Sequence, residues 1–164
     1  MNIKGELIPE FDQEMATTRR LLERVPSDKG EWKPHTKSFS LAHLAQLVSN
    51  MPGWLVNIVH ETSLDLSKAP KYSNETTQTL LASFDRNVAE AKAALMAASE
   101  ADLAVGWSLT MGERVLMTMP RSVVVRQTIN HLVHHRAQLT VYFRLLDVPV
   151  PSIYGPTADE GWGG

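Results

Sequence analysis

The 164-residue chain contains no cysteine. This absence excludes disulfide bonds, thiolate nucleophiles and sulfur ligands for a metal, and it favours a cytoplasmic protein. The chain also lacks an excess of either charge, because 16 basic and 18 acidic residues leave a formal net charge of −2. Without a basic surface to attract phosphates or anionic lipids, we expect neither a nucleic acid nor a membrane as a partner.

Long apolar runs and nucleotide-binding motifs are missing as well. No run approaches the roughly 20 apolar residues of a membrane-spanning helix, and residues 1–6 do not resemble the start of a signal peptide. We find no P-loop, GxGxxG or GxSxG pattern, so nucleotide hydrolysis, dinucleotide binding and serine-based acyl transfer have no support. The composition, 43% hydrophobic and 21% charged, predicts one globular domain over residues 1–164.

Four segments have the apolar period of amphipathic helices: they cover residues 6–25, 41–61, 75–99 and 119–146. Pro9 allows the first helix to become regular only at that residue, and Pro26 should stop it. Ser40 can cap the second helix. We expect Pro52 to kink that helix without ending it, since apolar spacing continues beyond the proline. Alternating residues around 111–112 predict a short hairpin or an extended segment before the last helix.

These elements predict an all-α fold, a four-helix bundle with an irregular C-terminal tail. The tail after Leu146 holds three prolines and four glycines. Val150, Ile153 and Tyr154 should pack its first half on the body of the protein. Its acidic residues 159–160 either fold over the opening of the bundle or form a disordered end.

The last predicted helix carries the only stretch that suggests chemistry. Half of the six histidines lie within residues 131–135. His131 and His135 are four residues apart, which places them on one face of a helix. Two such imidazoles can bind one divalent ion, but a catalytic metal usually has three protein ligands. A hydrogen-bonded, partly buried pair is the alternative interpretation. His134 is either a general base, a partner of the ligands, or a surface residue.

Several motifs together carry a family resemblance. They are WSL, MPR and NHLVHHRAQLTVYFRLLDVPVPSIYGPTADE in the C-terminal half, with WKPHTKSFSLAHLAQL from Trp32 upstream. This pattern resembles the DinB-like family of damage-inducible bacterial proteins, in the DinB/YfiT-like metalloenzyme superfamily, over roughly residues 10–160. The resemblance implies a four-helix bundle in up-down-down-up order, a homodimer in many members, and a role in stress responses.

The resemblance also implies a metal centre. Many relatives hold a divalent metal such as Zn, Ni or Fe with three histidines, and the two on the last helix correspond to His131 and His135. The third falls seven residues after Ser40, at Leu47, which has no lone pair to donate. His43 lies one turn earlier, a displacement of about 5.4 Å against a bond of about 2 Å.

Three outcomes therefore remain for this centre: a weakened or absent metal site, a site completed by His43 or a tail residue, or an intact site on a differently aligned helix. We expect Leu47, His134, Gln138 and Tyr154 to lie in the pocket or beside its ligands. Arg136, next to the pair, would form a salt bridge at the helix surface or bind an anion.

The resemblance implies a metal-dependent transferase or hydrolase acting on a small molecule. Some members of the superfamily use a low-molecular-weight thiol such as bacillithiol or mycothiol, although most members close to this pattern have no established reaction. A bound metal would lower the pKa of a water or thiol at its open position. The alternative, favoured by Leu47, is a non-catalytic dimeric binding or scaffold protein associated with stress that has lost its metal.

Overall fold

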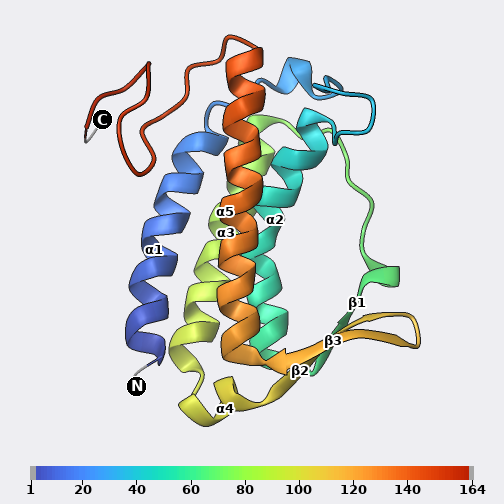
Figure 1. The fold of residues 1–164 in the computed structure, drawn as a ribbon. Helices are drawn as coiled ribbons and strands as arrows, with labels where there is room; N and C mark the ends of the chain where they lie inside the picture. The colour runs from blue at the N-terminus through green and yellow to red at the C-terminus, as the bar shows by residue number, and fades with distance from the viewer. Residues whose placement is uncertain (1–2, 163–164) are drawn as a thin grey trace.

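The protein is a bundle of four long helices with a small sheet at one end (Figure 1), as described by a computed structural model of residues 3–162. The long helices are α1 (Ile3–Leu22), α2 (Leu41–His60), α3 (Thr77–Ala97) and α5 (Arg121–Leu145). The predicted all-α four-helix bundle is confirmed. No helix in this part of the chain is long and apolar enough to cross a membrane.

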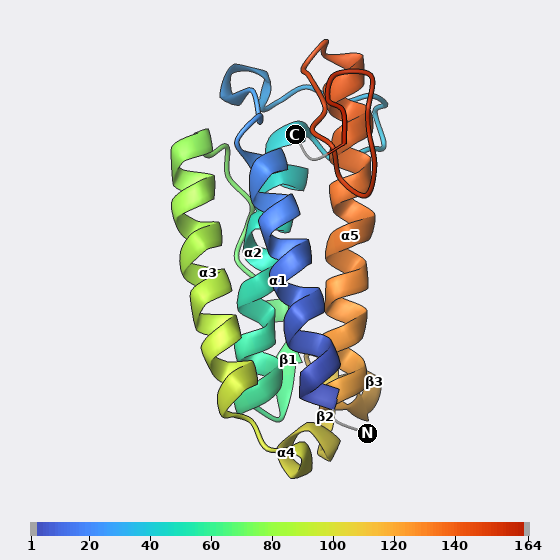
Figure 2. The same cartoon turned by 90° about the vertical axis from the view of Figure 1, so that its left-hand side faces the viewer.

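The helices follow the up-down-down-up order that the resemblance implies. In Figure 1, α1 and α5 run upward, whereas α2 and α3 run downward. Figure 2 shows α1 in front, between α3 and α5, and the contacts place α2 behind it against the same two helices. Because α2 and α3 are parallel neighbours, the chain between them must run back along a helix of about 30 Å. Residues 61–76, the return segment, make this connection.

The return segment contributes a strand that the sequence analysis missed. Strand β1 (Ser63–Asp65) pairs in parallel with β2 (Gly106–Met111), which pairs antiparallel with β3 (Arg114–Pro120). The last two strands form the predicted hairpin, whose turn contains Gly112 at a φ of +59°. A strand of three residues is too short for alternation to be visible in the sequence. Two short helices adjoin the strands in the chain: η2 (Leu66–Lys68) follows β1, and α4 (Glu100–Ala104) precedes β2.

Asp65 connects the return segment to the hairpin. Its carboxylate accepts a hydrogen bond of 2.8 Å from the backbone N–H of Gly112 and further bonds from the backbone and hydroxyl of Ser67. These donors favour the charged form, so they hold the pKa of Asp65 at about 2. One carboxylate therefore fixes the start of the return segment against the hairpin turn.

The helix ends agree with the predicted signals except in α1. That helix begins at Ile3 and continues through Pro9, so a regular start at the proline is wrong; it also ends at Leu22, before the predicted limit. Pro9 is the seventh residue of α1, so it removes one backbone hydrogen bond near the start of a helix that has 20 residues. Ser40 caps α2 by accepting the N–H of His43, and α2 runs through Pro52 without ending. The predicted cap and the continuation of α2 past Pro52 are confirmed, whereas the kink at Pro52 stays a prediction.

The C-terminal tail has no helix or strand between residues 146 and 162, as predicted, yet it packs against the bundle. Arg20 of α1 and Arg24, in the turn after α1, both pair with Glu160, and Arg144 of α5 pairs with Asp159 at 2.6 Å. Val150 is buried. Residues 159–160 therefore lie on the bundle, as in the folded alternative, and do not form a disordered end.

Candidate functional site

The two histidines expected to act together do lie together. His131 and His135 face the same side of α5, with their Nε2 atoms 2.9 Å apart. His135 is 8% exposed, and its Nδ1 lies 2.7 Å from Oε1 of Gln138, one turn further along the helix. The sequence prediction that Gln138 lies beside the pair agrees with this contact. These three side chains form one hydrogen-bonded chain.

The direction of the hydrogen bonds follows from the chemistry of Gln138. Its carbonyl oxygen can only accept, so Nδ1 of His135 carries the hydrogen. The Nε2 of neutral His135 is then an acceptor, and His131 donates to it from its own Nε2. Nδ1 of His131 consequently keeps its lone pair. The lone pair on Nδ1 of His131 can therefore accept a proton, while its Nε2–H donates to His135, which in turn donates to Gln138.

His135 is buried, whereas the side chain of His131 is exposed. Partial loss of water contact still lowers the pKa of His131, with repulsion from His135 and His134 adding to the effect. Burial also lowers the pKa of His135, although the hydrogen bond to Gln138 opposes the shift. The pKa of His43 on α2 is lowered by burial first, then by His135 and Lys33.

We expect the free energy of unfolding to fall as the pH drops below 6.5, the ordinary pKa of histidine. The folded pKa values of the three histidines are lowered, so the unfolded chain binds more protons in this range and is favoured. Carboxylates with lowered pKa values change the free energy of unfolding only below about pH 4.5, so their effect is separate from that of the histidines. Urea unfolding at pH 7.5, 6.5 and 5.5 measures the slope. A His131→Asn, His135→Gln double variant should flatten it, and an unchanged slope would contradict the assignment.

His43 and Leu47, the two positions on α2 considered for a third metal ligand, pack against aromatic and apolar side chains. The ring of His43 stacks between Phe39 and Tyr72, at centroid distances of 4.1 and 3.9 Å. Leu47 is 6% exposed and belongs to the apolar core. Within residues 3–162, no group of three or more histidine, aspartate or glutamate side chains is placed to hold a metal ion.

The histidine pair therefore fits only part of a metal centre. Two nitrogens that each bind one ion at about 2.1 Å lie about 3.0 Å apart when their bonds are at right angles and about 3.4 Å apart in a tetrahedral centre. The observed separation of 2.9 Å is close to the first value. The third donor is absent from the described part of the chain. A centre with three histidines does not fit this arrangement, and His43 as a ligand stays a prediction.

Two other expected pocket residues lie apart from the reactive nitrogens. His134 is exposed, with its ring edge-on to His135 at 5.0 Å between centroids. The hydroxyl of Tyr154 contacts the carboxylate of Glu14 at 2.9 Å and accepts a hydrogen bond from Arg136. Glu14 belongs to α1, whereas the histidines face α2. The tail folds onto the α1 side of α5, which separates Tyr154 from the pair.

Arg136 corrects another expectation, because it is not a surface residue. It is 1% exposed, and its guanidinium pairs with Glu14 at 2.7 Å. The same guanidinium donates to the backbone oxygen of Glu14 and to the hydroxyl of Thr18. The position beside the histidines turns this side chain toward α1, where α1 and the tail exclude water from it.

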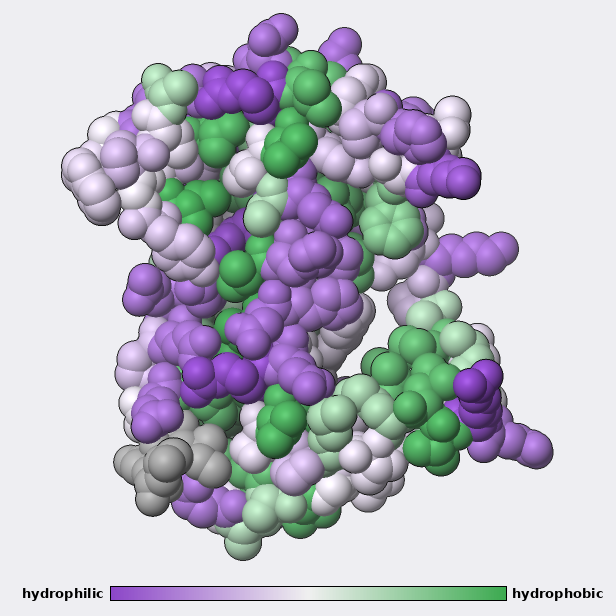
Figure 3. Space-filling view, viewed as in Figure 1, coloured by the Kyte–Doolittle hydropathy of each residue, from purple (hydrophilic) through white to green (hydrophobic). Residues whose placement is uncertain are grey.

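An apolar cavity of about 390 Å³ lies beside His131, between α2, α5 and the sheet. Its lining consists of Trp54, Ile58, Leu64, Leu66, Trp107, Leu109, Met117, Val124, Gln127, Thr128 and His131. Figure 3 shows the molecule hollowed between the bundle and the hairpin, with apolar side chains gathered on the hairpin side. The ring of Trp54 is 6.0 Å from that of His131, between centroids. Sequence reasoning missed this cavity because β1 was not predicted and because the packing of the hairpin against α2 and α5 depends on tertiary contacts.

The fold and the histidine pair are those of a small helical-bundle protein with two imidazoles on its last helix, and a comparison with protein families identifies the family. The model of the DinB family matches residues 1–162, so the chain belongs to the DinB family. The resemblance found in the sequence is confirmed. No curated protein matches the chain.

Solved structures show the same fold. A DinB-like protein from Bacillus subtilis has a TM-score of 0.69 at 18% identity, over 94% of this chain and 99% of its own. A DinB-like protein from Bacillus cereus has a TM-score of 0.70 at 21% identity, over 90% and 95%. A mycothiol-dependent maleylpyruvate isomerase has a TM-score of 0.65 at 18% identity, over 83% of this chain and 60% of its own. Likeness at these identities concerns the fold alone.

Proposed function

We propose that the protein binds a small molecule in the apolar cavity and transfers a proton to or from it at His131. The observation that carries this proposal is that the cavity borders the imidazole of His131, which is hydrogen-bonded to His135. The fold shared with an isomerase of maleylpyruvate supports a small molecule as the substrate. A volume of about 390 Å³ is within the range of small-ligand pockets.

The hydrogen-bonded chain suits His131 to the role of a general base. A proton taken up at Nδ1 makes His131 cationic, and its Nε2–H then donates a stronger hydrogen bond to His135. Gln138 holds His135 in the tautomer that accepts this bond. His135 and Gln138 are therefore positioning residues. The apolar lining excludes water from the ligand and stabilises its apolar part by about 25 cal/mol per Å² buried.

We expect His131→Ala to weaken binding of the probe p-nitrophenol about tenfold, since a lost hydrogen bond costs about 1–1.5 kcal/mol. Trp54 and Trp107 line the cavity, so quenching of their fluorescence follows binding. His134→Ala is the matched control, because His134 is exposed and does not line the cavity. A lack of saturable quenching, or equal weakening in both variants, would overturn the proposal.

A second candidate is a transferase or hydrolase that depends on Zn, Ni or Fe, favoured by the convergence of two Nε2 atoms at 2.9 Å. Its third ligand would come from a moved His43 or from the substrate. Metal content of the protein purified without a histidine tag tests this function. Stoichiometric metal that is lost in His135→Ala supports it, and metal-free protein in both cases contradicts it.

Failure of both tests would favour the non-catalytic alternative, a stress-associated binding or scaffold protein. The homodimer that the resemblance implies stays a prediction. It is supported by the apolar Val141 and Leu145, which are exposed on the outer face of α5.

A further inference from the structure

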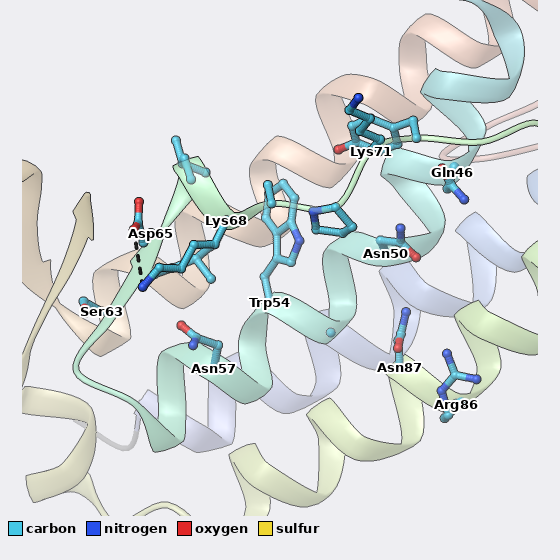
Figure 4. A pocket seen from close by; sticks show the side chains of 16 residues that line it. Gln46, Asn50, Trp54, Asn57, Ser63, Asp65, Lys68, Lys71, Arg86 and Asn87 are labelled. Carbon is cyan, nitrogen blue, oxygen red and sulfur yellow. Dashed lines mark ion pairs between the residues drawn. The ribbon is translucent and has the colours of Figure 1, made fainter. Parts of the chain in front are cut away.

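A second, larger cleft lies on the other side of Trp54 from the apolar cavity. It has a volume of about 760 Å³ and lies between α2, α3 and the return segment (Figure 4). Trp54, Leu64 and Leu66 line both spaces. The parallel order of α2 and α3 is the cause of this cleft, because the return segment must pass along the outside of both helices.

The α2 wall of the cleft is a row of carboxamides. Gln46, Asn50 and Asn57 recur at steps of four and seven residues, so they share one face of an otherwise largely buried helix. Gly53 lies in the same row, and a Cβ there would come within 3.3 Å of the side chain of Asn87 on α3. In Figure 4, Asn50 and Asn87 project into the space between the two helices.

The wall is polar, and part of it is engaged within the protein. Asn57 accepts the indole N–H of Trp107 at 3.2 Å, and Asn87 donates to the backbone oxygen of Ser49 at 3.1 Å. Asn50 and the carbonyl oxygen of Asn87 remain available to a ligand.

The return segment is held at both ends of the cleft. Asp65 binds it to the hairpin turn, as described above. At the other end, the side chain of Gln46 accepts the N–H of Ser73 at 2.8 Å and donates to its hydroxyl at 3.0 Å. Residues 66–72 between these anchors cover the carboxamides. The cleft is therefore a fixed feature of the connection and not an open helix surface.

The charged groups that line the cleft are mostly cationic. They are Lys68, Lys71, Arg86 and the single carboxylate Asp65. Lys68 pairs with Asp65 at 3.7 Å. Lys71 and Arg86 have no ion-pair partner within residues 3–162, since the neighbouring Asp85 is bound by Arg19. In a chain of net charge −2, this cleft is a local positive region that attracts anions.

We propose that the cleft is a binding site for a small hydrophilic organic anion carrying a carboxylate or phosphate group. The anionic group binds Arg86, which offers a planar fork of donors, and Lys71 adds attraction from the return segment. Hydroxyl or amide groups of the ligand bond to Asn50 and Asn87. The site uses neither histidine of the pair, so it goes beyond the proposed function and is independent of it.

Titration with inorganic phosphate and, separately, with malonate tests this site at constant ionic strength. Side-chain amide signals of Asn50 and Asn87 and the indole signal of Trp54 in ¹H–¹⁵N NMR spectra report on the cleft. We expect saturable shifts with at least one anion, and about fivefold weaker binding in Arg86→Gln, because one charge pair at 4 Å in water contributes about 1 kcal/mol. Lys71→Gln should weaken binding less.

Lys37→Gln is the matched control, since Lys37 is an exposed lysine outside the cleft lining. It should leave the shifts unchanged, and so should His131→Ala, which separates this site from the apolar cavity. Shifts with phosphate alone or malonate alone support the site and identify its anion. Shifts with neither anion, or equal weakening in Lys37→Gln and Arg86→Gln, would overturn the proposal.

Discussion

Leu47→His is expected to raise the affinity of the protein for Zn²⁺ about 100-fold. Structural zinc sites with four ligands bind with about 10–16 kcal/mol, so one additional imidazole contributes about 3 kcal/mol. The substitution places an imidazole at the position on α2 where the resemblance implies the third ligand. His131 and His135 already present two nitrogens 2.9 Å apart. Isothermal titration calorimetry of wild-type and variant proteins measures the change.

Leu47→Gln is the matched control for this prediction, because it introduces a polar group at the same buried position without an imidazole. Circular dichroism should show that both variants retain their helices. Adding His135→Ala to Leu47→His should abolish the gain, since the ion then loses one of its three nitrogens. Equal affinities in Leu47→His and Leu47→Gln would show that the pair and α2 do not share a metal site.

Arg136→Met is expected to lower the free energy of unfolding by about 3–5 kcal/mol, the usual cost of breaking a buried ion pair from one side. The arginine is 1% exposed, and its partner Glu14 is also buried. Removing the guanidinium leaves a carboxylate that is shielded from water with only Tyr154 to donate to it. Urea unfolding monitored by circular dichroism at pH 7.5 measures the loss.

The double variant Arg136→Met, Glu14→Met separates an unpaired buried charge from a lost packing contact. If the stranded carboxylate is the cause, the double variant should be more stable than Arg136→Met alone, because both charges are removed together. Tyr154→Phe provides a mild comparison and should cost about 1 kcal/mol for one hydrogen bond. Additive losses in the double variant would contradict the coupling between Arg136 and Glu14.

Local patterns predicted the long helices, the hairpin and the histidine pair. A period of 3.6 residues repeated over 20 or more positions is a strong signal. Five apolar residues spaced at that period are buried in α5: Val125, Ile129, Leu132, Leu139 and Phe143. His131 and His135 share a face because helical geometry alone places residues four apart together. The boundaries of α1 were less accurate, since a proline in the first turns is compatible with two different starts.

What the sequence determined by itself is therefore the four long helices, the proximity of two imidazoles and the family resemblance. The helices and the imidazole pair depend on spacing within one element, and the resemblance depends on motifs that are recognised along the chain without knowledge of their contacts. Only the tertiary structure decided the placement of β1, the apolar cavity and the cleft beneath the return segment, and it turned Arg136 and Tyr154 toward Glu14. These features join residues from elements far apart in the chain. Their contacts depend on which helices are neighbours and on the path of the return segment, and no local period encodes either.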